Sequence, residues 1–71
     1  MNNFAVVTEI FINEAGESSV TSLVYPDVDE GKSAFHDKAR FVPLFKDKGY
    51  KAVMIVDKTL QNIIPPVMKE N

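Results

Sequence analysis

Two segments near the start of the chain have the spacing of apolar residues that is typical of β-strands. They are residues 4–12, FAVVTEIFI, and residues 18–26, SSVTSLVYP, and both contain many β-branched or aromatic side chains. The turn cluster NEAGE, residues 13–17, lies between them, and its Gly16 can adopt a positive φ without steric cost. The pattern therefore predicts a β-hairpin.

A helical pattern begins after the second strand. Asp27 is placed to cap the helix, because its side chain can accept a hydrogen bond from the free backbone N–H groups of the first turn. Lys38 falls within the apolar arc of the helix, so its ammonium group must extend to the rim of that arc. The apolar residues that form the arc at helical spacing are Val28, Ala34, Phe35, Ala39, Phe41, Val42 and Phe45.

The end of the helix is predicted from glycine and proline. The helix is expected to extend to about Lys48 and to end at Gly49 in a left-handed conformation. Pro43 has no N–H to donate to the preceding turn, so we expect a kink or a break between Arg40 and Pro43. Such a bend would also turn Leu44 toward the sheet.

Two further strands complete the predicted fold. Residues 51–57, KAVMIVD, are apolar on both faces, as in a central strand. Residues 63–68, IIPPVM, form a weaker fourth strand, whose two prolines restrict it to an edge. A right-handed crossover places the third strand beside the first, so the predicted sheet has strand order 2-1-3-4. The fold class is α+β: a small, mostly antiparallel sheet with one kinked helix on one face.

Length and composition limit the class of protein. The chain has 71 residues, no cysteine, one histidine and a formal net charge of −2. We expect a single domain over residues 1–71, with residues 65–71 in an edge strand or in an extended or flexible tail. Disulfides and thiolate metal sites are excluded, and no cofactor or small-molecule substrate is predicted. The negative charge argues against a nucleic-acid partner. Neither a signal peptide nor a membrane span is recognised, so we expect a cytoplasmic location.

Apolar residues on both faces of the sheet point to self-association. One helix covers only one face, and an exposed apolar face usually marks an interface. We predict a homo-oligomer, with the dimer as the favoured form, that associates through Val7, Phe11, Met54 and Val56. Two alternatives stay open: the C-terminal segment IIPPVMKEN folds over this face, or another protein covers it.

The histidine does not resemble a catalytic centre. His36 lies opposite the apolar arc, with Lys32 four residues before it and Arg40 four residues after it, so the three form a basic ridge on the helix. Catalysis by histidine needs an orienting carboxylate and a nucleophile within reach, and the neighbouring Asp37 points elsewhere. We therefore expect a non-enzymatic protein. The alternative function is weak, salt-sensitive binding of an anion or nucleic acid on this ridge.

Three short segments also resemble a known group of proteins. They are SAFHDKA, KAVMIVD and NIIPPV, within residues 4–68. Together they resemble small uncharacterised proteins encoded by bacteriophages and prophages, which share the order of hairpin, helix and strand. The resemblance implies a phage-derived protein, and it supplies no activity or functional residues. Our hypothesis is that such a protein acts by protein–protein contact in phage assembly or host modulation.

Overall fold

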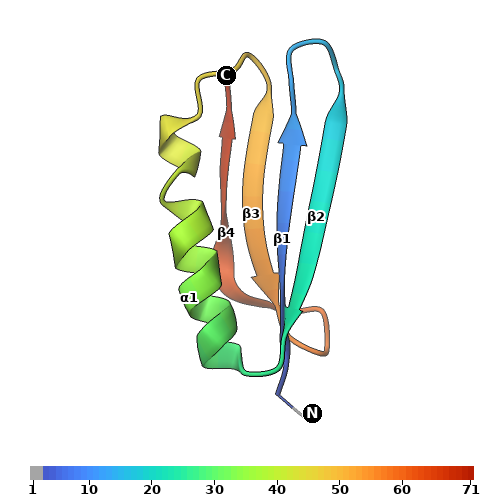
Figure 1. Cartoon of the computed structure of the whole chain (residues 1–71), viewed down its shortest axis with the longest axis vertical. Helices are drawn as coiled ribbons and strands as arrows, with labels where there is room; N and C mark the ends of the chain where they lie inside the picture. The colour runs from blue at the N-terminus through green and yellow to red at the C-terminus, as the bar shows by residue number, and fades with distance from the viewer. Residues whose placement is uncertain (1–2) are drawn as a thin grey trace.

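The chain forms an antiparallel sheet with a bent helical segment on one side. The computed structural model describes residues 3–71 (Figure 1); residues 1–2, which the single-domain prediction includes, lie outside the described residues. In chain order the elements are β1 (Ala5–Ile12), β2 (Ser18–Tyr25), α1 (Val28–Ala39), the 3₁₀ turn η1 (Val42–Leu44), β3 (Tyr50–Val56) and β4 (Asn62–Glu70). The sheet order is β2-β1-β3-β4, and each neighbouring pair is antiparallel. The predicted fold class, strand order and bent helix are confirmed.

The turn between β1 and β2 is held by one asparagine. The side-chain oxygen of Asn13 accepts hydrogen bonds from the N–H groups of Ala15 and Glu17, at 3.0 and 2.9 Å. The backbone N–H of Asn13 donates to the Glu17 carbonyl at 2.9 Å, and Gly16 has a φ of 84°. This is a three-residue loop with a left-handed residue at its last position, and Gly16 adopts the positive φ that its lack of a side chain allows.

The turn between β3 and β4 has the same construction with different residues. The Asp57 carboxylate accepts hydrogen bonds from the N–H groups of Thr59 and Gln61, at 2.8 and 3.1 Å. The N–H of Asp57 donates to the Gln61 carbonyl at 3.0 Å. The left-handed position is occupied by Leu60, with a φ of 64°. A branched side chain therefore adopts a conformation here that glycine adopts in the first turn.

The helix begins as predicted and ends earlier than predicted. Asp27 is the N-cap residue, and its side chain accepts a hydrogen bond from the Asp29 N–H at 2.9 Å. The helix ends at Ala39, and the break predicted between Arg40 and Pro43 is confirmed. Its continuation to Lys48 is wrong, because the chain becomes extended at Phe45, the residue that follows η1.

Two expectations for the segment after the break are wrong. Leu44 is 64% exposed and does not turn into the core. Gly49 is not a left-handed helix terminus, since Gly16 is the one glycine with a positive φ. A Cβ atom at position 49 would instead clash with the backbone carbonyl of Ile12. Glycine is therefore required at position 49 by the close approach of two chain segments.

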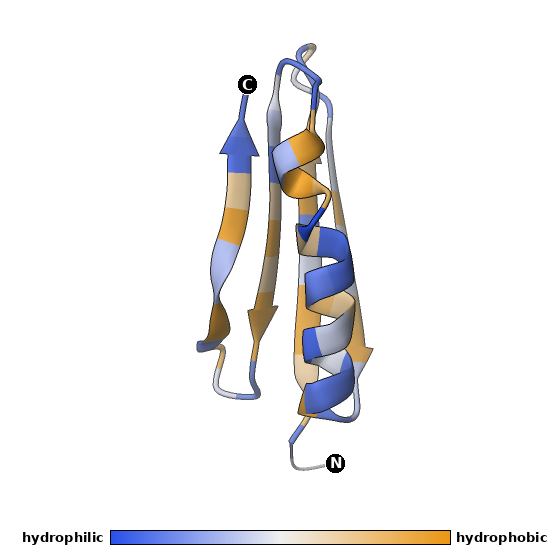
Figure 2. Cartoon of the chain, turned by 90° about the vertical axis from the view of Figure 1, so that its left-hand side faces the viewer, coloured by the Kyte–Doolittle hydropathy of each residue, from blue (hydrophilic) through white to orange (hydrophobic). Residues whose placement is uncertain are grey.

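The core lies between α1 with η1 and one face of the sheet. Phe35 and Val42 are each 1% exposed and contact the central strands, where Val53 and Ile55 are fully buried. Phe41, which was expected on the packing face, is 52% exposed, because the break after Ala39 rotates it away. In Figure 2 the helix presents a mostly hydrophilic surface to the viewer, while the strands behind it carry hydrophobic stretches.

Candidate functional site

The strand register decides which residues share each face of the sheet. Val7 lies opposite Ile55 on one side and Leu23 on the other, whereas Val6 lies opposite Val56 and Val24. Val7 and Ile55 are buried in the core, so the odd-numbered residues of β1, β2 and β3 face the helix. The even-numbered residues of these strands face the opposite way.

The predicted self-association face is therefore wrong for two of its four residues. Val7 is 2% exposed in the core, and the Phe11 and Phe45 rings pack in a T-shaped arrangement with centroids 5.4 Å apart. Both residues lie on the helix side of the sheet. Met54 and Val56 lie on the other side, as predicted. The error arose because alternation in β1 tells which residues share a face but not which face the helix covers.

An ion pair on the helix side could have resolved this ambiguity. The Lys38 Nζ donates to a carboxylate oxygen of Glu9 at 2.9 Å. This hydrogen bond holds the pKa of the Lys38 ammonium above its ordinary value, despite an opposing effect of partial burial. Glu9 shares its face with Val7 and Phe11, and Lys38 lies within the apolar arc of the helix. The pairing of these two charges between the helix and the sheet is the signal that would have shown which face of β1 the helix covers.

The other side of the sheet has no covering element among the residues that the structure describes. We call the open face the surface formed by the even-numbered residues 6–12 of β1, 18–24 of β2 and 50–56 of β3. It includes Val20 and Val24, which are 64% and 60% exposed. No residue of this set is charged. In a sheet with one solvated face, apolar side chains normally face the core and polar side chains face the solvent. A solvated face that is uncharged and largely apolar is therefore unusual.

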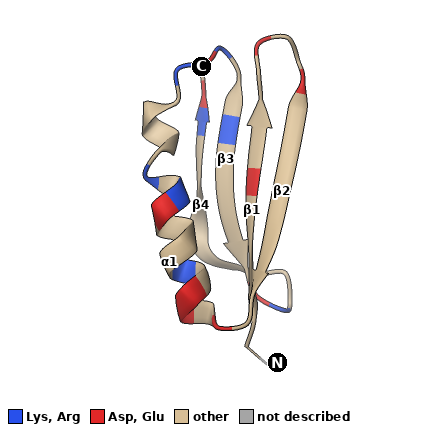
Figure 3. Cartoon of the chain, in the orientation of Figure 1, with Lys and Arg blue, Asp and Glu red and all other residues tan. Residues whose placement is uncertain are grey.

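Charged side chains of the sheet lie elsewhere. Glu9 and Lys51 face the helix side, together with Lys69, which donates to the Pro43 carbonyl at 2.9 Å. Glu70, at the end of β4, is opposite Tyr50 and lies at the border of the open face. Figure 3 shows the same distribution: β2 carries no charged residue, and most charges lie on α1 and the turns. The chain has 18 charged residues, 8 basic and 10 acidic. The open face is therefore uncharged because these residues lie elsewhere, and not because the chain has few of them.

A small polar centre interrupts the open face. The hydroxyl oxygens of Thr8 and Ser22 are 2.9 Å apart and form a hydrogen bond across β1 and β2. Each hydroxyl therefore already has a partner within the sheet. Burial of these two residues in an interface would therefore keep their mutual hydrogen bond, which lowers the cost of removing them from water.

The C-terminal segment does not cover the open face. Residues Asn62–Glu70 pair with β3 as an edge strand, and Ile63, Ile64 and Val67 pack against the core cluster. The alternative that IIPPVMKEN folds over the open face is therefore wrong. The register shifts between Val53 and Val56, opposite the stretch of β4 that contains its two prolines.

The predicted basic ridge lies on the surface of the helix. Lys32 and His36 belong to α1, Arg40 is its C-cap residue, and His36 is exposed as predicted. Within residues 3–71, no side-chain hydrogen bond or salt bridge engages any of the three. The Arg40 guanidinium lies 4.9 Å from the centre of the exposed Phe41 ring. The basic ridge and the neighbouring ring of Phe41 together present cations and an aromatic ring to solvent.

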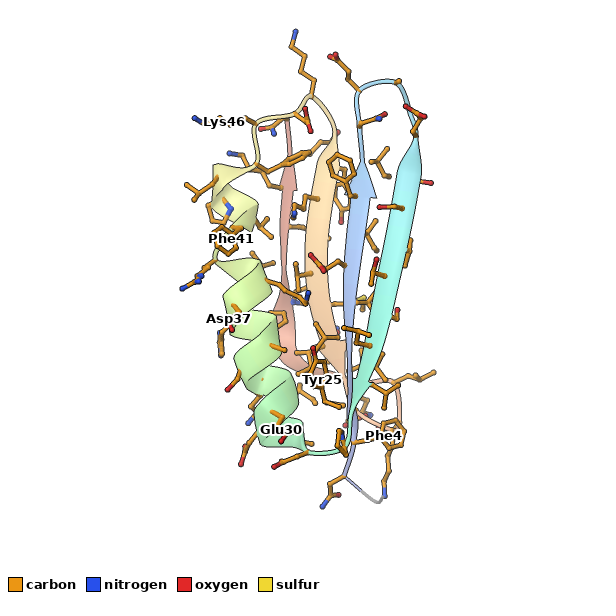
Figure 4. All side chains as sticks on the ribbon, in the orientation of Figure 1. Phe4, Tyr25, Glu30, Asp37, Phe41 and Lys46 are labelled. Carbon is orange, nitrogen blue, oxygen red and sulfur yellow. The ribbon has the colours of Figure 1, made fainter. Side chains whose placement is uncertain are left out.

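A cleft of about 280 Å³ lies at the end of the sheet near the N-cap of α1. Its lining includes Phe4, Val28 and the β3–β4 turn, beside which Phe4 is seen in Figure 4. The hydroxyl of Thr59, followed by the N–H groups of Gln61 and Thr59, holds the pKa of the Asp57 carboxyl below its ordinary value. These hydrogen bonds commit the carboxylate to the turn, so the cleft offers no free acid or base from Asp57.

Comparison with family models, curated proteins and solved structures finds no match. Within residues 3–71, no group of three or more histidine, aspartate or glutamate side chains is arranged to hold a metal ion. No helix in the same part of the chain has the length and apolar character needed to cross a membrane. The open face, which is uncharged and has no covering element among the described residues, is the principal candidate for a functional surface.

Proposed function

We propose that this protein acts by self-association through its open face, without catalysing a reaction. The observation that carries the proposal is an exposed sheet surface without charge, in a chain of which 25% is charged. Contiguous apolar patches larger than about a few hundred Å² are rare on monomers and usually mark an interface. The occupant proposed here is a second copy of the chain, because a surface without charges has no like charges to oppose it in a symmetric contact.

The size of the open face is compatible with a weak dimer contact. Eight residues at about 3.3 Å each, and three strands about 4.8 Å apart, give a face of roughly 26 by 14 Å. This is roughly 370 Å² per copy, so two copies bury about 740 Å², which is the size of weak or transient contacts rather than of stable complexes. The area per copy is less than a tenth of the 4759 Å² surface of the chain. The contact would be weak and dependent on protein concentration.

The proposal is tested by placing one charge on the open face. Met54 lies on β3 opposite Thr8, so Met54→Lys would bring a lysine from each copy into the contact. We expect light scattering after size exclusion to give twice the 7.9 kDa of one chain for the wild type. The variant should dissociate at least about 100-fold more readily, because an unpaired charge is costly to bury.

The matched control carries the same charge away from the open face. Leu60 is 80% exposed in the β3–β4 turn, so Leu60→Lys should leave the mass and its concentration dependence unchanged. Circular dichroism would verify that both variants are folded. A wild type that remains monomeric at submillimolar concentration would refute the proposal, and so would equal masses for the two variants.

The basic ridge supports a second candidate function, binding of an anion or a single-stranded nucleic acid. Arg40 and the exposed ring of Phe41 stand together, and an aromatic ring beside a cation is the combination on which unpaired bases stack. Binding should weaken steeply with added salt and be lost in the Lys32→Glu/Arg40→Glu double variant. Lys46→Glu/Lys48→Glu makes the same charge change in the loop before β3 and is the control. Binding that is equal in both double variants would refute a site on the ridge.

We further propose a biological role in phage assembly or in modulation of a host. The resemblance to phage-encoded proteins favours such a role. Either role would use the same protein–protein contact.

A further inference from the structure

Strand β2 is an unprotected edge of the sheet. It is the first strand in the order β2-β1-β3-β4, and seven of its eight residues are exposed. Its sequence, SSVTSLVY, contains neither a charged residue nor a proline, and its pairing with β1 continues without a register shift from Ser18 to Tyr25. Natural edge strands are usually shortened, charged, bulged or interrupted by proline, because free backbone groups invite another strand. None of these devices is present in β2.

The opposite edge of the same sheet is protected. In β4, Pro65 and Pro66 have no N–H to donate, and the pairing with β3 shifts register in this stretch. Lys69 and Glu70 add charge near the end of the strand. The two edges therefore differ, and only β2 offers a regular ladder of free donors and acceptors.

The hydrogen bonds of the hairpin show which groups of β2 are free. The Asn13 N–H donates to the Glu17 carbonyl, so these two residues form a hydrogen-bonded pair. Hydrogen-bonded and non-hydrogen-bonded pairs alternate along an antiparallel ladder. The backbone groups of the odd-numbered residues 19–25 therefore bond to β1. Those of the even-numbered residues 18–24 point outward to the free edge.

We propose that β2 pairs antiparallel with β2 of a second copy, joining two four-stranded sheets into one continuous sheet. The inference rests on the proposed self-association but assigns it a different surface, the edge of the sheet. Two copies with a net charge of −2 each repel one another, and this uncharged strand brings no charged side chains together. Backbone hydrogen bonds provide the contact, as in other cases of strand addition.

One register satisfies the free groups best. Residues whose backbone groups point to the free edge must pair with residues of the same kind in the second copy. The two-fold axis must therefore pass through a residue and not between two residues. The residues nearest the middle of β2 are Thr21 and Ser22. Centring on Thr21 aligns residues 18–24 of both copies and places Val20 opposite Ser22. Centring on Ser22 would bring Ser18 opposite Pro26, which has no N–H. The register centred on Thr21 is therefore the one we assign.

Disulfide cross-linking tests the edge and its register together. The chain has no cysteine, so a single substitution introduces a unique thiol. Thr21 would lie opposite Thr21 of the second copy in a non-hydrogen-bonded pair, with Cα atoms about 4.5 Å apart, which a disulfide can span. Under mild oxidation Thr21→Cys should form a covalent dimer about tenfold or more faster than Leu60→Cys, which places the thiol in the exposed β3–β4 turn. Equal rates for the two folded variants would refute the pairing.

A second pair of variants separates the backbone donor from the side chain. Ser22→Pro removes an N–H that points to the free edge, whereas Ser22→Ala removes the same hydroxyl and keeps the N–H. In the Thr21→Cys background, rapid cross-linking should persist with Ser22→Ala and be lost with Ser22→Pro. Equal cross-linking in the two variants would overturn the inference.

Amide hydrogen exchange provides a test on the unmodified chain. With rising protein concentration, the N–H groups of Val20, Ser22 and Val24 should become protected from exchange. Those of Thr21 and Leu23 bond to β1 and should be protected at every concentration. Protection that does not change with concentration at Val20 and Val24 would refute the pairing.

These measurements distinguish the edge from the open face. Rapid cross-linking of Thr21→Cys that persists with Met54→Lys supports edge pairing even if the open face is not an interface. The opposite result has two parts: Met54→Lys loses association, and Thr21→Cys in a chain that retains Met54 does not cross-link rapidly. This result supports the open face and refutes the edge.

Discussion

The two hairpin turns offer a matched test of backbone strain. Both turns have three loop residues, an Asn or Asp that receives backbone hydrogen bonds, and a left-handed residue at the last loop position. That residue is Gly16 in the first turn and Leu60 in the second, with φ values of 84° and 64°. Leu60→Gly should therefore stabilise the fold, and Gly16→Leu should destabilise it.

The magnitude follows from two opposing effects. A residue with a Cβ atom is disfavoured by about 1–2 kcal/mol in the left-handed conformation. Glycine loses more conformational entropy on folding, which costs about 0.5–1 kcal/mol. Leu60 is 80% exposed and nothing lies within 4 Å of a Cβ atom built on Gly16, so packing contributes little at either site. The net effect is about 0.5–1 kcal/mol, or about 2–8 °C in Tm for a chain of this size.

Urea unfolding monitored by circular dichroism measures both effects. We expect a higher midpoint for Leu60→Gly, a lower midpoint for Gly16→Leu and an unchanged slope in each case. The turns lie at opposite ends of the sheet (Figure 1), so the double variant should be close to the wild type. The reasoning would be refuted if Leu60→Gly lowered the midpoint, or if the two substitutions changed it in the same direction.

Three further predictions concern the fold. Gly49→Ala should destabilise the protein by about 3 kcal/mol in urea unfolding, because the new Cβ meets the Ile12 carbonyl, a backbone group that cannot rotate away. Phe35→Ala should cost about 3–5 kcal/mol, whereas Phe41→Ala should cost no more than about 1 kcal/mol, since Phe35 is 1% and Phe41 52% exposed. The pKa of Asp57 is lowered in the folded state, so its contribution to stability is present above its ordinary pKa of about 3.9 and is lost as the pH falls through the folded value. Unfolding measured from neutral to acidic pH should therefore have a smaller acid dependence in Asp57→Asn; an equal dependence would contradict this assignment.

The overall fold was predictable because several local signals agreed. Strands 1 and 3 were apolar on both faces and are the two central strands, and two prolines restricted the last strand to an edge. Asp27 and Pro43 marked the start of the helix and its break. The role of Gly49 was not predictable in this way, since its contact is with a residue 37 positions away, and a helix terminus explained the same glycine equally well.

The assignment of faces failed for a physical reason. Alternation in a strand tells which side chains point the same way, and in β1 both sets are large enough to form a core. Only a contact between elements distant in sequence decides between them. Glu9 with Lys38 is such a contact: a charge on the helix-facing side of β1 needs a partner on the helix, and Lys38 is the basic residue within the apolar arc. A charge in an otherwise apolar pattern was therefore more informative than the apolar residues themselves.

The edge and the open face belong to the same part of the molecule, and this relates the two proposed contacts. The even-numbered residues of β2 have side chains on the open face and free backbone groups at the edge. A second copy that pairs with this edge would extend the open face across the junction, because the two-fold axis is perpendicular to the sheet and keeps both helices on one side. Edge pairing would thus satisfy the backbone of β2 while doubling the uncharged surface of the sheet. A larger apolar surface gives a stronger drive toward a further contact, so we expect the open face to associate more readily in the edge-paired form than in a single chain.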